Sequence, residues 1–94
     1  MIFEIYENDV VGTLYYDRIP FIKNIRKTGL FYEDVISFLA KDNNLKISYD
    51  YDIFTNRLCF KLFGSITNML RFRNELKTLF DLTEDTKKEH YANL

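Results

Sequence analysis

Few side chains in this 94-residue sequence have the type and spacing that catalysis or metal binding needs. There is one cysteine, Cys59, and one histidine, His90. One thiol and one imidazole do not make the usual three or four ligands of a zinc site, and a single cysteine forms no internal disulfide. Asp50 and Asp52 lie two residues apart, so on a strand both carboxylates point from one face, where they could hold a cation or act as an acid–base pair.

We favour a structural interpretation for each of these candidates. Cys59 falls inside a predicted strand, whereas reactive thiols need an electropositive and partly open setting. His90 falls in a polar segment near the C-terminus, and alternating acids on the wet face of a hairpin discourage edge-to-edge pairing. The sequence has no glycine-rich phosphate loop and only 3 glycines to build one. We therefore predict a protein that is not an enzyme and has no metal or cofactor.

A basic segment from residue 18 to residue 27 is the sharpest charge feature, because four cations occur there with no acid between them. With cations further along the chain they could contact a phosphate backbone, while Tyr15, Tyr16 or Tyr51 stacks on bases. The cations of this nucleic-acid hypothesis are Arg18, Lys23, Arg26, Lys27, Arg71 and Lys77. The net charge of −1 is not that of a dedicated nucleic-acid module, so we favour helix capping and solubility as their role.

Aromatic residues are in surplus: 9 Phe and 7 Tyr make up 17 % of the chain, more than one small core needs. Exposed aromatics near Arg are typical of protein interfaces. The alternative is a sheet covered on both faces by the helices and the C-terminal segment. Arg73 falls at the margin of an apolar helical stripe. We favour a position in which its apolar stem lies along the stripe and its charge reaches water; the alternatives are that it pairs with a buried acid or anchors an interface.

Hydrophobic periodicity predicts the elements that position these side chains in the first half of the chain. Residues 2–6 and 10–16 flank a polar turn and predict a β-hairpin, in which Gly12 indicates a bulge or a close approach. Pro20 and Gly29 bracket a short helix over residues 20–27. A second helix, ended by residues 42–44, is expected to bury one apolar arc. The residues of that arc are Phe31, Tyr32, Val35, Ile36, Phe38 and Leu39.

The second half repeats this order of elements. Alternating apolar residues from Leu45 to Ile53 predict a strand with one buried face, and residues 58–63 predict the return strand of a hairpin. Ser65 is a ready N-cap for a last helix that ends near Leu82. Its apolar stripe is expected to pack on the sheet. The residues of that stripe are Ile66, Met69, Phe72, Leu76, Leu79 and Phe80.

These elements predict an α+β fold of order ββα(α)ββα. Two β-hairpins form a mostly antiparallel sheet, with two or three helices in a single layer on one face. A chain of this length buries one core and excludes a second domain. We expect a single domain over residues 1–82 and a polar C-terminal extension over residues 83–94, as a frayed helix or a flexible tail.

Composition bears on location and source. The chain is 47 % hydrophobic and 29 % charged, which is typical of a globular protein. It has no apolar run of 18 residues and no basic leader, so we expect a cytoplasmic protein (in the host cytoplasm if viral) without a membrane partner. Abundant Ile, Phe, Asn, Lys and Tyr, with scarce Ala, Gly and Pro, indicate an AT-rich microbial or phage genome.

The functional expectation is a small protein-binding module, acting as an inhibitor or modulator by protein–protein contact, with a homodimer as one form of that contact. The expected contact residues are Tyr15, Tyr16, Arg18, Phe63 and Arg73. The alternative is an RNA or single-stranded nucleic-acid binder that uses the basic segment and the sheet tyrosines. The two differ in salt dependence, because phosphate contacts weaken steeply as salt rises.

Overall fold

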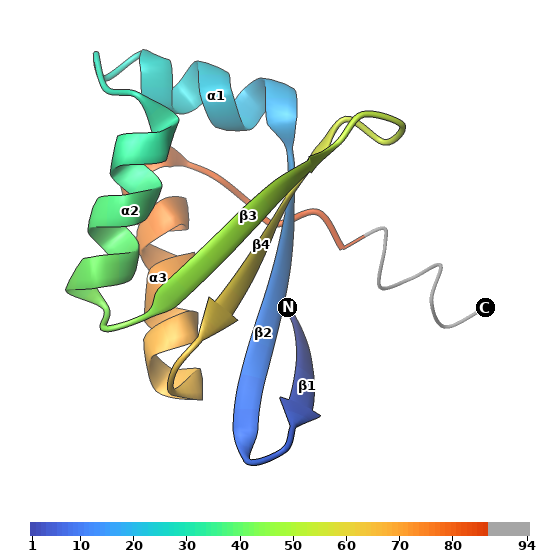
Figure 1. Ribbon diagram of the computed structural model, residues 1–94. Coiled ribbons are helices and arrows are strands. Elements are labelled where there is room, and N and C mark those ends of the chain that lie inside the picture. Colours follow the sequence, from blue (N-terminus) through green and yellow to red (C-terminus); the bar gives the residue numbers. More distant parts are fainter. Residues whose placement is uncertain (87–94) are drawn as a thin grey trace.

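A computed structural model describes residues 1–86 of the chain (Figure 1). Its elements run in the order ββααββα, which confirms the predicted α+β fold. They are β1 (Ile2–Tyr6), β2 (Asp9–Asp17), α1 (Arg18–Arg26), α2 (Tyr32–Asp42), β3 (Lys46–Asp52), β4 (Arg57–Phe63) and α3 (Ile66–Phe80). His90 and the rest of the extension from residue 87 lie outside the described residues.

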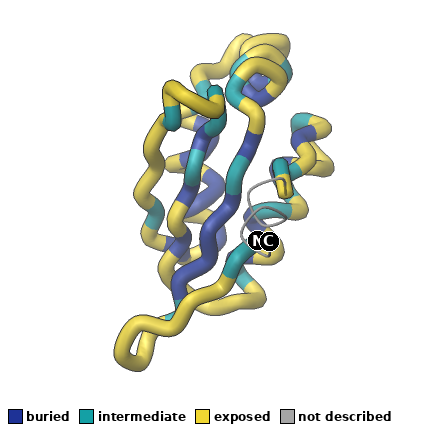
Figure 2. Tube along the Cα trace, turned by 90° about the vertical axis from the view of Figure 1, so that its right-hand side faces the viewer, coloured by how far each residue is buried: buried dark blue, intermediate teal, exposed yellow. Residues whose placement is uncertain are grey.

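The four strands form one antiparallel sheet in the order β1-β2-β4-β3. The two hairpins join through β2 and β4, where Leu14 lies opposite Phe60 and Tyr16 opposite Leu58. The three helices lie on one side of this sheet (Figure 1). Buried positions follow the middle of the sheet, whereas most of the edge strand β3 is exposed (Figure 2).

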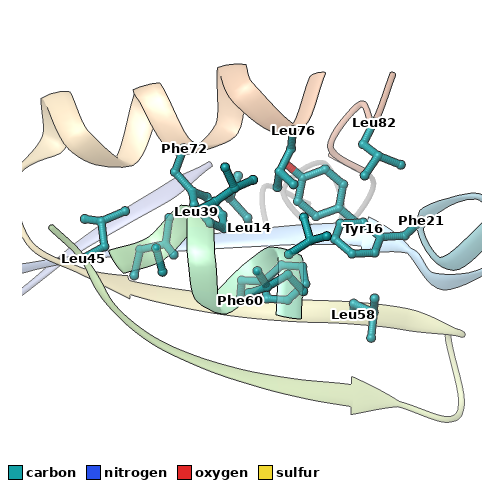
Figure 3. Close-up of a cluster of buried hydrophobic side chains, with 14 of the residues drawn as sticks. Leu14, Tyr16, Phe21, Leu39, Leu45, Leu58, Phe60, Phe72, Leu76 and Leu82 are labelled. Carbon is teal, nitrogen blue, oxygen red and sulfur yellow. The ribbon is translucent and has the colours of Figure 1, made fainter. Parts of the chain in front are cut away.

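The core lies between the helices and the face of β2 and β4 that carries Leu14 and Phe60. An aromatic cluster occupies one end of it, where the Phe60 ring centroid lies 5.4 Å from that of Phe21 and 5.8 Å from that of Tyr16 (Figure 3). Tilted and edge-to-face contacts of this kind add stability beyond the area that the rings bury. The helices complete the core with Phe21, Ile25, Ile36, Met69, Phe72 and Leu76, all fully buried.

Side-chain caps set two helix starts. The Asp17 carboxylate accepts a hydrogen bond from the Ile19 N–H at 3.2 Å, so α1 begins at Arg18, two residues before the predicted start. The Ser65 hydroxyl accepts one from the Asn68 N–H at 3.1 Å, as predicted for α3. Both bonds satisfy a backbone donor that has no partner inside its helix.

Gly12 marks a close approach and not a bulge, because the pairing of β2 with both neighbours continues through it. A Cβ atom at Gly12 would lie 2.6 Å from the Met69 sulfur of α3 and 2.9 Å from the Met1 sulfur. The absence of a side chain therefore lets α3 pack closely on β2.

Several residues predicted for the core are exposed. Phe31 precedes α2 because the helix begins only at Tyr32, and Phe38 lies outside the part of α2 that contacts the sheet. Ile66 and Leu79 lie near the two ends of α3 and are exposed as well. The residues predicted on the buried face of the third strand are also exposed. Tyr49 and Tyr51 lie on the edge strand β3, and Ile53 lies in the turn after it. Both helices carry wider apolar arcs than the sheet covers.

Residues 81–86 are not helical. Asp81 adopts a left-handed conformation and ends α3, and Leu82 is buried. The Asp85 N–H then donates to the Tyr15 carbonyl at 2.6 Å, at the edge of β2 beyond the end of β1. This part of the predicted extension is thus extended chain held against the sheet edge (Figure 1).

Candidate functional site

The five expected contact residues do not lie together. Tyr16 is only 1 % exposed and belongs to the core, because it shares the helix-covered face of β2 with Leu14. Tyr15 and Phe63 lie on the opposite face of the sheet. Arg18 and Arg73 lie on two different helices. Tyr16 therefore drops out of any surface, and the other four do not make one patch.

Arg73 pairs with an acid that is largely buried. Its guanidinium donates to the Glu84 carboxylate at 3.1 Å, and the same carboxylate accepts from the Met1 ammonium at 2.6 Å. The Glu84 side chain is 13 % exposed. Of the three roles considered for Arg73, pairing with an acid is the one that the structure contains.

The Tyr16 hydroxyl lies buried close to this ion pair. Within residues 1–86 no group forms a hydrogen bond with it. Burial raises the pKa of Tyr16 strongly, the Glu84 charge raises it further, and the Arg73 charge lowers it. The folded protein therefore holds this phenol in its neutral form.

We expect Tyr16→Phe to raise the free energy of unfolding by about 1 kcal/mol at pH 7, because it removes a buried polar group without a partner. Above pH 10 the unfolded chain loses the Tyr16 proton while the folded chain keeps it, so wild-type stability falls as pH rises. The stabilisation by Tyr16→Phe relative to the wild type should therefore be about 1.4 kcal/mol larger at pH 11 than at pH 7. Urea unfolding at both pH values measures this, and a destabilised variant at pH 7 would contradict it.

The outer face of α1 gathers the basic segment. Lys23, Arg26 and Lys27 are exposed there, and a shallow concavity includes them with Arg18 and two isoleucines. The Arg18 guanidinium lies over the Tyr51 ring, 4.7 Å from its centroid. Such a contact links the start of α1 to the edge of the sheet.

The remaining cations of the nucleic-acid hypothesis lie elsewhere. Lys77 forms an ion pair with Asp81 at 3.1 Å. α3 meets α1 at Phe80, whose carbonyl accepts a hydrogen bond from Asn24. Arg71 lies nine residues before Phe80 on α3, which corresponds to about 14 Å along the helix axis. The predicted six cations therefore do not form one continuous surface; α1 carries three of them, and Lys27 caps its C-terminal end.

Cys59 and Asp52, which were considered above for catalysis or metal binding, have the surroundings of structural residues. Cys59 is half-buried on the sheet face away from the helices, opposite Tyr15 and Asp50. The Asp52 carboxylate accepts from the N–H groups of Phe54 at 3.0 Å and Thr55 at 3.4 Å, and so shapes the β3–β4 turn. Across residues 1–86, no three His, Cys, Asp or Glu side chains are grouped as a metal site requires.

An apolar groove runs between α2 and α3, and we call it the α2–α3 groove. Its lining is Leu30, Asp34, Val35, Phe38, Leu39, Leu79 and Phe80. Leu30, Phe38 and Leu79 are 52 %, 68 % and 59 % exposed. Of these three, Phe38 and Leu79 were predicted for the core from helical periodicity. Periodicity does not show that the apolar arcs of two helices are wider than the sheet face that they share.

Comparison with protein-family models, curated proteins and solved structures finds no match for the chain. In the part of the chain that the structure describes, no helix has the length and apolar character to cross a membrane.

Proposed function

We propose that this protein is a small non-enzymatic protein-binding module that takes an apolar segment of another protein into the α2–α3 groove. The exposure of Leu30, Phe38 and Leu79 around one groove carries this proposal. A fully exposed aromatic side chain has roughly 200 Å² of surface, so Phe38 exposes roughly 140 Å² at the groove. With the two leucines, the apolar area reaches the several hundred Å² that mark interaction sites.

The groove suits a helix of the partner. It lies between two helices, where a third helix can place apolar side chains three and four residues apart along the groove. Asp34 is the charged residue in the lining, so it favours a basic residue beside the apolar row of that helix. A partner bound in this way is inhibited or modulated by contact alone, which fits a small microbial or phage protein.

Affinity capture tests the proposal when two matched variants are compared with the wild type. Phe38→Asp puts a charge at the groove, and because Phe38 is exposed the fold should tolerate it. Phe54→Asp makes the same change at the β3–β4 turn, away from the groove. We expect a partner protein that survives nuclease treatment and is retained by the Phe54→Asp variant but lost from the Phe38→Asp variant.

Two further results discriminate between occupants. If the wild type sediments as a dimer and the Phe38→Asp variant as a monomer, the occupant of the groove is a second copy. If nuclease releases every partner, or the Phe38→Asp variant keeps them all, the groove is not the binding site.

A further inference from the structure

A second surface combines cations with protruding apolar side chains at one end of the molecule. We call it the α1 face, and it comprises the outer side of α1 and the tip of the β3–β4 turn. Its cations are Arg18, Lys23, Arg26 and Lys27, and its apolar residues are Ile19, Ile53 and Phe54. Of these side chains, only that of Arg18 takes part in a contact described above.

The two parts of the α1 face are joined. The Arg18 N–H donates to the Asn56 carbonyl at 3.0 Å, and the Arg18 guanidinium lies over Tyr51 of β3. Figure 1 shows α1 and the β3–β4 turn at the same end of the molecule. One flat partner can therefore reach both parts at once.

The apolar residues of this face project strongly. Phe54 is 92 % exposed, Ile53 70 % and Ile19 63 %. The Asp52 carboxylate holds the backbone of the turn through the Phe54 and Thr55 N–H groups, so the tip is a formed turn. Single exposed apolar residues are ordinary, but here three of them stand beside four cations.

The cations of the α1 face are available for a partner. Within residues 1–86, Lys23, Arg26 and Lys27 make no ion pair. The nearest acid in the sequence, Asp17, caps α1 through the Ile19 N–H. The face is thus positively charged along α1 although the whole chain has a net charge of −1.

We propose that the α1 face docks on a bilayer surface that carries anionic headgroups. Phe54 and Ile53 enter the interface between headgroups and acyl chains, and the α1 cations lie against the headgroups. This contact is peripheral and needs no spanning helix, and it departs from the expectation above that the protein has no membrane partner. It is also independent of the α2–α3 groove.

Nucleic acid is another polyanion that the positively charged α1 face could bind. Phe54 is the one apolar residue of the face with a ring that could stack on a base, since Ile19 and Ile53 have none, and Arg18 already covers one face of the Tyr51 ring. Aliphatic tips beside cations fit an interface with an apolar interior better than a phosphate backbone in water. The observations therefore favour the lipid surface.

A tryptophan reporter tests this proposal, since the chain contains no Trp. The F54W variant is mixed with vesicles of phosphatidylcholine alone and with vesicles that also contain phosphatidylglycerol. F63W is the matched control, because Phe63 is exposed on the sheet face away from the helices. We expect a blue shift of F54W emission with the anionic vesicles only, and no shift for F63W.

The cations of the α1 face provide a second test of the proposal. Each surface cation contributes about a fivefold factor to binding anionic lipid, so Lys23→Gln with Arg26→Gln should weaken vesicle binding roughly 30-fold. Added salt should weaken it as well. An equal shift with neutral vesicles, a shift of F63W, or no shift at all would overturn the proposal. If a single-stranded oligonucleotide binds instead and depends on Lys23 and Arg26, the face is a nucleic-acid site.

Discussion

Phe60→Ala is expected to lower the free energy of unfolding by about 3–5 kcal/mol. Phe60 is fully buried on central strand β4, and its ring contacts those of Tyr16, Phe21 and Tyr49. Its removal leaves a cavity where β2, β3, β4 and α1 meet, so the neighbouring rings lose packing as well. A domain of this size has only about 5–14 kcal/mol of stability in total.

Phe54→Ala is the matched control, because it makes the same change at an exposed turn. We expect it to shift the free energy of unfolding by less than about 0.5 kcal/mol. Urea unfolding followed by circular dichroism measures both variants. A loss below about 1 kcal/mol for Phe60→Ala would show that the aromatic cluster is not the centre of the core.

Gly64→Ala should cost about 3 kcal/mol, from two independent causes. Gly64 connects β4 to α3 with a φ of 155°, a conformation that residues with a side chain rarely adopt. An added Cβ atom would also lie 2.7 Å from Leu45 Cδ2 and 3.3 Å from the Asn44 carbonyl oxygen. The link between α2 and β3 would have to move away from the start of α3.

Gly29→Ala separates these causes. Gly29 has a φ of 82°, but nothing lies within 4 Å of the position where a Cβ atom would be added. This variant therefore carries only the backbone cost, about 1 kcal/mol. Thermal and urea unfolding of both variants measures the difference, and equal losses would contradict a tight contact at Gly64.

Local patterns predicted the fold because short-range physics determines them. Leu58, Phe60 and Leu62 alternate with polar or smaller residues, and the structure buries all three on the helix side of β4. Ser65 caps α3 as its residue type and position predict. Capping and strand alternation depend on neighbours a few residues away, so one sequence is enough to find them.

Which residues of the candidate surfaces are exposed depends on long-range packing, which local patterns do not determine. Tyr16 is buried because β2 lies second in the sheet and the helices cover that part of it, and neither the strand order nor the helix positions follow from periodicity. Phe38 and Leu79 fit helical stripes, yet a periodic stripe does not tell how much of its width the sheet covers. The extended course of residues 83–86 likewise depends on partners far away in sequence, among them Arg73 and Tyr15.

The binding constant of the captured partner for the Phe38→Asp variant tests the central proposal most directly. Calorimetric titration against the wild type, the Phe38→Asp variant and the Phe54→Asp variant gives three dissociation constants. If the α2–α3 groove is the binding site, Phe38→Asp weakens binding at least about 30-fold, as expected for a central interface residue, and Phe54→Asp leaves it within about twofold. Wild-type affinity in a folded Phe38→Asp variant would contradict the account.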